Sequence, residues 1–188
     1  MRILSHFPAI GVSNAYLIGP EGGGDAVLVD PGQFDVALLN MIEDNGYDIK
    51  AVLATHDHGN HVQGLRTLLK VYDVEIYAGN DNVLGFPAKS VNDGDSFMIA
   101  GLDVEVLYVL GHTIDSRVYK IGPVLFTGDI ISAGRCGTSA TVHSREIMIE
   151  SIKGKILSYD DETLVLPGHG PPTTVGAEKR WNPEIVVK

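Results

Sequence analysis

The chain of 188 residues is poor in cysteine and in positive charge. It holds one cysteine, Cys136, and 14 lysine and arginine residues against 24 aspartate and glutamate residues. A single cysteine excludes an intramolecular disulfide framework, and we expect a cytoplasmic protein. The net charge of −10 repels nucleic acid phosphates and anionic membranes. We therefore expect no nucleic acid and no membrane among its partners.

Long apolar runs and several common catalytic motifs are also missing. No apolar run approaches the roughly 18 residues of a transmembrane helix, and polar residues and a proline interrupt residues 1–20, so we expect no signal peptide. The sequence contains no G-x-S-x-G elbow, no P-loop and no G-x-G-x-x-G motif. Serine hydrolase and nucleotide-binding functions therefore have no support.

Short apolar runs alternate with segments of helical periodicity. Helices are predicted from about Asp35, over 61–72, and over 144–161 with Ser144 as the cap. The predicted strands are short, and those in the middle of the chain end in Gly or Asp. They cover 14–19, 26–30, 51–55, 74–79, 96–101, 103–111, 124–129 and 162–168. Helices interspersed among more numerous strands favour a layered α/β or α+β sandwich. No linker or repeat divides the chain, so we expect a single domain over 1–188.

Five of the seven histidines lie in three segments that follow apolar strands, and each segment contains a glycine. Three of them stand in "THDHGNH" (55–61), and the rest in "GHT" (111–113) and "PGHG" (167–170), with an aspartate in "TGD" (127–129). The spacing H-x-H-x-x-H does not fit one face of a helix. Imidazoles and a carboxylate from separate strand ends suit Zn²⁺ or Fe²⁺. The predicted metal ligands are His56, His58, His61, His112, Asp129 and His169.

These motifs resemble the metallo-β-lactamase superfamily, whose signature is H-x-H-x-D-H followed by a separate His, an Asp and a last His. The segments "LVDPG", "THDHGNH", "LGHTIDS", "LFTGD" and "PGHGPPTTVGAEKRWNP" occur in the family's order. The last segment is most similar to the small glyoxalase II-like (hydroxyacylglutathione hydrolase-like) branch. The resemblance implies a four-layer αββα sandwich with metals at one edge, between the two sheets.

The resemblance also implies a ligand set and a reaction. One metal is held by His56, His58 and His112. A second is held by residue 60, His61 and His169, and Asp129 bridges the two. The expected cofactor is Zn²⁺, one or two ions per chain, with Fe²⁺ and Mn²⁺ as alternatives. Family members use metal-bound hydroxide to attack a carbonyl, commonly of a thioester. The expected substrate is a small molecule, with an anionic thioester as the candidate. Asp30 either accepts a hydrogen bond near the histidine loop, residues 55–61, or forms a strand-end turn before Pro31.

Three positions depart from the family pattern. Asn60 stands where the family has aspartate, and with Asp129 it is a candidate catalytic residue. Because an amide is neutral and a poorer zinc ligand, we expect the second metal to bind more weakly or not at all. Asn60 alternatively serves as a helix N-cap, with Gln63 at N3. Leu110 and Asp115 stand where the family often has Pro and Gly. Asp115 either hydrogen-bonds near His112 or, as we expect, is a solvated loop residue.

Three functions follow from these features. The first is a metal-dependent, glyoxalase II-like thioester hydrolase. The second is an oxidoreductase that resembles the persulfide dioxygenases of the superfamily, with one iron on His56, His112 and Asp129. The third is a member of low activity, owing to Asn60.

Overall fold

The computed structural model describes residues 1–8 and 12–186. Two six-stranded sheets form its centre. The first has the order β1 (Arg2–His6), β2 (Ala15–Gly19), β3 (Gly24–Val29), β4 (Tyr47–Leu53), β5 (Glu75–Ala78) and β8 (Lys89–Ser90). The second has the order β16 (Thr173–Thr174), β15 (Leu164–Pro167), β12 (Val124–Gly128), β11 (Arg117–Ile121), β10 (Leu102–Tyr108) and β9 (Ser96–Ile99). Two hairpins are formed by β6 (Asn82–Val83) with β7 (Phe86–Pro87), and by β13 (Ile131–Ser132) with β14 (Arg135–Cys136).

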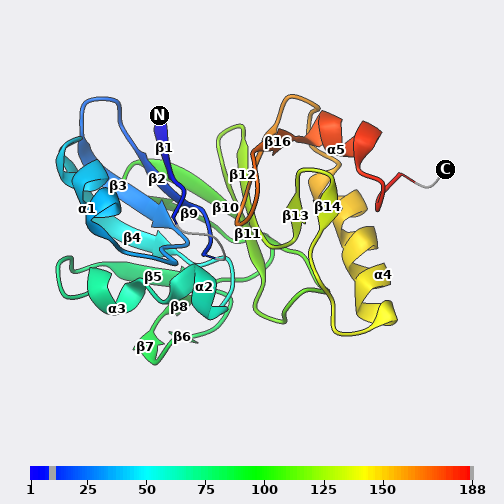
Figure 1. Cartoon of the computed structure of the whole chain (residues 1–188), viewed down its shortest axis with the longest axis horizontal. Coiled ribbons are helices and arrows are strands. Elements are labelled where there is room, and N and C mark those ends of the chain that lie inside the picture. The colour runs from blue at the N-terminus through cyan, green and yellow to red at the C-terminus, as the bar shows by residue number, and fades with distance from the viewer. Residues whose placement is uncertain (9–11, 187–188) are drawn as a thin grey trace.

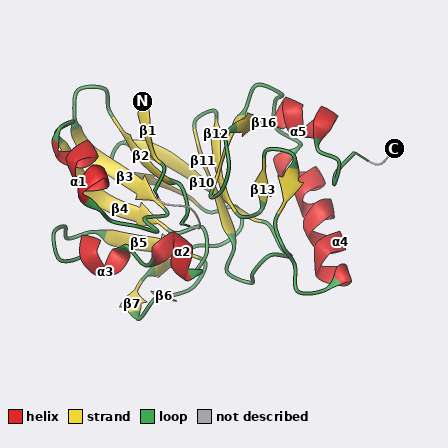
Figure 2. Cartoon of the chain, viewed as in Figure 1, coloured by secondary structure: helices red, strands yellow, loops and turns green. Residues whose placement is uncertain are grey.

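Helices cover the outer faces of both sheets (Figure 1). On the side of the first sheet lie α1 (Val36–Glu43), α2 (Gly59–Val62) and α3 (Leu65–Leu68). On the side of the second lie α4 (Val142–Ser151), which continues as the π-helix η1 (Ile152–Ile156), and α5 (Val175–Trp181). Figure 2 shows the resulting order of helix, sheet, sheet and helix from left to right. This is the αββα sandwich that the family resemblance implies, and it confirms the layered fold that the sequence pattern favours.

Three hydrophobic clusters separate the four layers. Leu17 of β2 packs towards α1, whereas its neighbours Tyr16 and Ile18 pack between the sheets. In β12 the pattern is the same, with Phe126 between the sheets and Leu125 towards α4. Because successive side chains point to opposite faces and both faces are covered, these strands are apolar at nearly every position, with the buried Thr127 of β12 as an exception. The continuous runs in the sequence are therefore the mark of strands that are buried on both faces.

Two helix predictions differ from the structure. The predicted helix over 61–72 is two short helices, α2 and α3, which are interrupted at Gln63 and Gly64. A Cβ at Gly64 would lie 2.1 Å from the carbonyl oxygen of Pro31. The loop between β3 and α1 therefore packs directly against the backbone at the point where the helix is interrupted. The cap of α4 is Thr141, whose hydroxyl accepts the N–H of Ser144, and not Ser144 itself. The prediction of α1 is confirmed, with Asp35 as its N-cap.

No helix in the described part of the chain is both long enough and apolar enough to span a membrane.

Candidate metal centre

The predicted site residues follow strands that end at one edge of the sandwich. Asp30 and His56 follow the parallel strands β3 and β4. Asp129 and His169 follow the parallel strands β12 and β15, and His112 follows β10, which runs in the same direction as β12 because both are antiparallel to β11. Strands that run in the same direction bring their carboxyl ends to one edge. The topology therefore gathers residues that are up to 139 positions apart.

All six predicted ligands come together there, in two groups that share Asp129. The ligand atoms of each group lie within 4.8 Å of one another. The first group is His56, His58, His112 and Asp129, and the second is His61, Asp129 and His169. Oδ1 of Asp129 lies 3.1 Å from Nε2 of His61, and Oδ2 lies 3.9 Å from Nε2 of His112. Asp129 therefore faces both groups.

The donor atoms at this centre fit a metal ion. Nε2 of His61, Nε2 of His112 and Oδ1 of Asp129 are buried and make no hydrogen bond of good geometry within the described residues. Buried polar atoms are normally satisfied, and each one that is not requires an explanation. Imidazole nitrogens and a carboxylate oxygen that converge on one point are the donors that Zn²⁺ and Fe²⁺ prefer.

Hydrogen bonds from outside the centre orient two of the imidazoles. Oδ2 of Asp30 lies 2.8 Å from Nδ1 of His61, and the same carboxylate accepts the N–H and the hydroxyl of Thr55. Nδ1 of His112 donates to the carbonyl oxygen of Thr138 at 2.8 Å. In both histidines Nε2 is thus the nitrogen that faces the centre. Such outer contacts fix the tautomer and orientation of a metal-binding histidine.

Asp30 combines both roles that its sequence context suggests. Asp30 is 1% exposed, and its side chain is hydrogen-bonded to Thr55 and His61 of the histidine loop. Its backbone also adopts a φ of 48°, a left-handed conformation that aspartate tolerates better than most residues. The turn before Pro31 therefore aims the carboxylate at Thr55 and His61.

The surroundings of the site shift the pKa values of two of its histidines in opposite directions. Burial and the neighbouring His61 lower the pKa of His56 to about 3, so this imidazole is neutral with a lone pair to offer. For His61, burial acts to lower the pKa, but Asp30 and Asp129 outweigh it and raise the pKa to about 9. Burial would raise the pKa of Asp129, but the close approach of His61, at 3.1 Å, and its attraction for the carboxylate hold that pKa below its usual range. The carboxylates of Asp30 and Asp129 thus favour a positive charge beside His61, and either a proton or a metal cation can supply it.

Asn60 lies beside the second group and is not a helix cap. The N-cap position of α2 is His58, without a side-chain cap bond, so the predicted capping role of Asn60 is wrong. Instead Nδ2 of Asn60 lies 2.9 Å from Nε2 of His169. The second group thus has two imidazoles and the shared carboxylate, with a neutral amide where the family has a second carboxylate.

A cavity of about 280 Å³ opens beside Asp129 and His169. Its lining also includes Ser132, Arg135, Cys136, Gly137 and Thr138. Within the described residues, no carboxylate lies within ion-pair distance of the exposed Arg135. The cavity therefore offers a free guanidinium next to the candidate metal centre. Burial and Glu184 raise the pKa of the Cys136 thiol to about 12, which disfavours the thiolate form near neutral pH.

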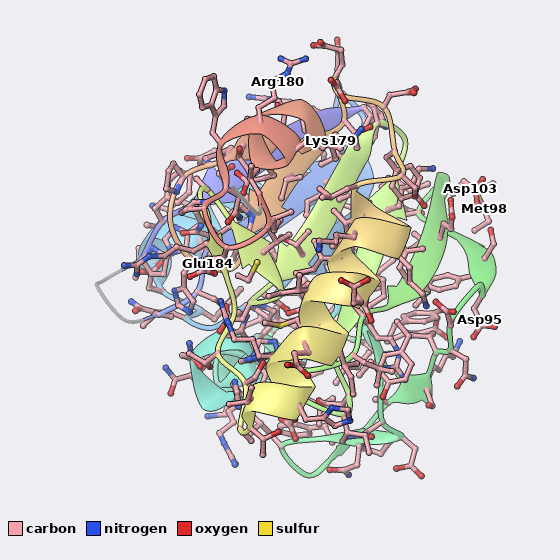
Figure 3. The ribbon with its side chains drawn as sticks, turned by 90° about the vertical axis from the view of Figure 1, so that its right-hand side faces the viewer. Asp95, Met98, Asp103, Lys179, Arg180 and Glu184 are labelled. Carbon is pink, nitrogen blue, oxygen red and sulfur yellow. The ribbon has the colours of Figure 1, made fainter. Side chains whose placement is uncertain are left out.

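The C-terminal segment supports this cavity wall, which sequence reasoning missed. A carboxylate oxygen of Glu184 accepts the N–H of Cys136 at 2.5 Å and a guanidinium hydrogen of Arg145 at 2.8 Å. Arg145 also donates to the carbonyl oxygen of Gly137 at 3.0 Å. Figure 3 shows Glu184 beside α4, the helix that carries Arg145. These contacts fix the segment that ends at Thr138, the partner of His112.

Comparisons with known proteins agree with this geometry. The sequence model of the metallo-beta-lactamase superfamily matches residues 9–169. The chain belongs to the metallo-β-lactamase superfamily. It is 32% identical to an uncharacterized protein of Mycobacterium tuberculosis, with 96% of each chain covered. It is 31% identical to the hydroxyacylglutathione hydrolase GloC of Haemophilus influenzae, over 85% of this chain and 86% of that protein.

Solved structures of the superfamily share the fold. The crystal structure of ETHE1 from Myxococcus xanthus has a TM-score of 0.87 and 28% identity, over 97% of this chain and 84% of that one. TTHA1623 in a di-iron-bound form has a TM-score of 0.79 and 28% identity, over 96% and 98% of the two chains. This superfamily member therefore has relatives named as hydrolases and a structural relative that binds two irons.

Proposed function

We propose that this superfamily member is a metal-dependent hydrolase that cleaves a small, anionic thioester. The observation that carries the proposal is the convergence of His56, His58, His112 and Asp129, with His61 and His169 beside them, at one edge of the sandwich. The likeness to a hydroxyacylglutathione hydrolase supports the thioester class. The acidic chain, which repels nucleic acids and anionic membranes, supports a small-molecule substrate.

Each ligand has a defined part in the proposed centre. His56, His58 and His112 would hold the first Zn²⁺, His61 and His169 the second, and Asp129 would contact both. When bound, the metal lowers the pKa of a water molecule towards ~7 and polarises a carbonyl oxygen. Fe²⁺ and Mn²⁺ are the alternative ions for this donor set.

Hydrogen bonds from surrounding residues orient the rings of His61 and His112. Oδ2 of Asp30 holds the proton at Nδ1 of His61, and the carbonyl oxygen of Thr138 holds the proton at Nδ1 of His112. In each ring Nε2 can therefore offer its lone pair to the metal. The backbone N–H and hydroxyl of Thr55 hold the carboxylate of Asp30 in place.

Arg135 would bind the anionic part of the substrate in the adjoining cavity. We expect Arg135→Gln to raise the KM of a carboxylate-bearing thioester about tenfold with little change in kcat. This corresponds to about 1.4 kcal/mol of binding lost equally from the ground state and the transition state. Steady-state kinetics with one acyl group on a charged and on an uncharged thiol carrier measures the effect. Arg180→Gln, on α5 and paired with Asp161, is the matched control. An equal KM change for both carriers would contradict this role for Arg135.

Thiol release from metal-loaded protein tests the proposed function. The purified chain is loaded with Zn²⁺, Fe²⁺ or Mn²⁺ and incubated with a panel of S-acylglutathiones and related thioesters. Free thiol is then measured over time. Release that a chelator abolishes and metal restores is the expected result. A metal-loaded protein that cleaves no member of the panel would exclude the proposal.

A mononuclear-iron dioxygenase is the second candidate, favoured by Asn60. Its neutral amide beside His169 weakens the second group, whereas the first retains two imidazoles and one carboxylate in His56, His112 and Asp129. That donor set matches the facial triad of non-haem iron oxygenases. Oxygen consumption with glutathione persulfide by the iron-loaded protein distinguishes this activity from hydrolysis.

A further inference from the structure

Asp115 lies three residues after His112, and its carboxylate is directed at the histidine loop. Asp115 is only 8% exposed, so the prediction of a solvated loop residue is wrong and the alternative, a hydrogen bond near His112, is the one that the structure has. Oδ2 of Asp115 accepts the backbone N–H of Asp57 at 2.8 Å. Asp57 stands between His56 and His58 in the sequence. One hydrogen bond thus joins the loops that carry three of the candidate ligands.

Contacts on several sides hold Asp115 in position. The adjacent Ser116 accepts the N–H of Thr113 and lies 2.6 Å from its hydroxyl, which closes the turn after His112. The N–H of Arg117 donates to the carbonyl oxygen of Thr55 at 2.7 Å. A Cβ at Gly79 would lie 2.1 Å from the carbonyl oxygen of Asp115, so the backbone after β5 packs against the same turn. Asp115 is therefore a rigid point of attachment for Asp57.

In the part of the chain that the structure describes, the ring of His58 has no hydrogen bond from outside the centre. The rings of His61 and His112 are each oriented by an oxygen from outside the centre, on Asp30 and Thr138 respectively. Within the described residues, the ring of His58 has one hydrogen-bonding partner, Nε2 of His56, which is itself a candidate ligand. The ring of His58 lies 5.0 Å from that of His112, at an interplanar angle of 87°. Its position depends on its backbone, and Asp115 holds that backbone one residue away.

We propose that Asp115 is a positioning residue that fixes His58 against His112 through the N–H of Asp57. The proposal rests on the metal centre proposed above. The carboxylate of Asp115 also adds negative charge near the first group, and two variants separate charge from position. Asp115→Asn keeps an oxygen acceptor of the same reach and removes the charge. Asp115→Glu keeps the charge but adds a methylene group, which pushes the acceptor out of register with the N–H of Asp57.

Metal affinity measures the proposed role directly. Zn²⁺ affinity is determined by competition with a chelating dye for the wild type, Asp115→Ala, Asp115→Asn and Asp115→Glu. Removing a residue that orients a ligand typically weakens metal binding about 10- to 100-fold. We expect that loss in Asp115→Ala and Asp115→Glu. Asp115→Asn should stay within about threefold of the wild type, because a neutral acceptor retains most of the constraint.

A spectroscopic readout separates positioning from general stability. The visible spectrum of Co²⁺ bound to the protein reports its ligand geometry, and we expect Asp115→Glu to change it and Asp115→Asn to preserve it. Thermal unfolding of the metal-free proteins records any loss of fold. Asp95→Ala is the matched control, because the carboxylate of Asp95 also accepts a loop N–H, that of Asn92. Asp95 lies on the side of the molecule that carries β9 (Figure 3). The Asp95→Ala variant should change neither the Zn²⁺ affinity nor the Co²⁺ spectrum.

The outcomes distinguish failure of this inference from failure of the metal centre. A wild-type protein that binds neither Zn²⁺ nor Co²⁺ overturns the metal centre and this inference with it. A wild-type protein that binds metal, together with an Asp115→Glu variant of the same affinity and spectrum, overturns the role of Asp115 alone. If Asp115→Ala does not fold, the comparison of Asp115→Asn with Asp115→Glu still decides.

Discussion

Replacing Asp129 by asparagine is expected to lower kcat/KM for the thioester by about 1,000-fold or more, equivalent to roughly 4 kcal/mol. The carboxylate of Asp129 is the one group shared by the two candidate ligand sets. Its oxygens lie 3.1 Å from Nε2 of His61 and 3.7 Å from Nε2 of His169. Asparagine has nearly the same shape but no charge, so the loss would come from electrostatics and metal binding rather than from packing.

Metal analysis and kinetics together check this prediction. Elemental analysis of Asp129→Asn should show less metal per chain than the wild type, and added metal should not restore the rate. Asp161→Asn is the control, because Asp161 is a carboxylate paired with Lys179 and Arg180 at the surface. It should leave both the metal content and kcat/KM unchanged. An Asp129→Asn protein with full metal content and an unaltered rate would refute a bridging role.

The ligand set could be predicted from sequence because strand direction controls it. A buried strand is a continuous apolar run, and the polar residue after it lies at the sheet edge. His56 after β4 and Asp129 after β12 are both of this kind. The same reasoning gave the layered fold, since residues on both faces of β2, β3 and β12 are buried.

The supporting contacts could not be predicted, because they depend on how distant loops pack. Asp115 looks like an exposed loop residue until the backbone at Gly79 is placed against it. Glu184 and Arg145 hold the cavity wall from two segments that share no sequence pattern with it. For Asn60, local sequence suggested a helix cap, but the helix begins at Gly59 with His58 in the N-cap position, and the side chain of Asn60 faces His169. Local pattern is a weak guide where a tertiary contact competes for the same side chain.

Asn60→Asp is expected to raise the metal content from about one to about two Zn²⁺ per chain. In the wild type, Asp129 is the single carboxylate shared by both groups, so two divalent cations would share one negative charge. The amide of Asn60 also offers an N–H donor to Nε2 of His169, at 2.9 Å. A metal ion would need the lone pair of the same nitrogen, so the amide and the metal compete for it. Aspartate supplies a charged acceptor at the same reach. It both removes the competing donor and attracts the second cation.

Titration with Zn²⁺ and elemental analysis after dialysis measure the change. We expect the second Zn²⁺ to bind at least about tenfold more tightly in Asn60→Asp, or about 1.4 kcal/mol, with the first little affected. Asn60→Ala is the matched control. It removes the N–H donor without adding a carboxylate, so a second tight site in this variant would assign the effect to His169 rather than to charge. Two equally tight Zn²⁺ sites in the wild type would contradict the argument from Asn60.

The same variant separates the three functions that the sequence leaves open. If the chain is a hydrolase that uses two metals, Asn60→Asp should raise kcat/KM for the thioester along with the metal content. If it is a hydrolase of low activity because of Asn60, the rise should be large, and the wild-type rate should increase with Zn²⁺ concentration as the weak second group fills. If it is a mononuclear iron oxygenase, a second metal should leave thioester hydrolysis absent, and oxygen consumption should depend on iron at His56, His112 and Asp129. Measuring metal content, thiol release and oxygen consumption on the same three proteins, wild type, Asn60→Asp and Asn60→Ala, therefore links the neutral amide at position 60 to the type of chemistry.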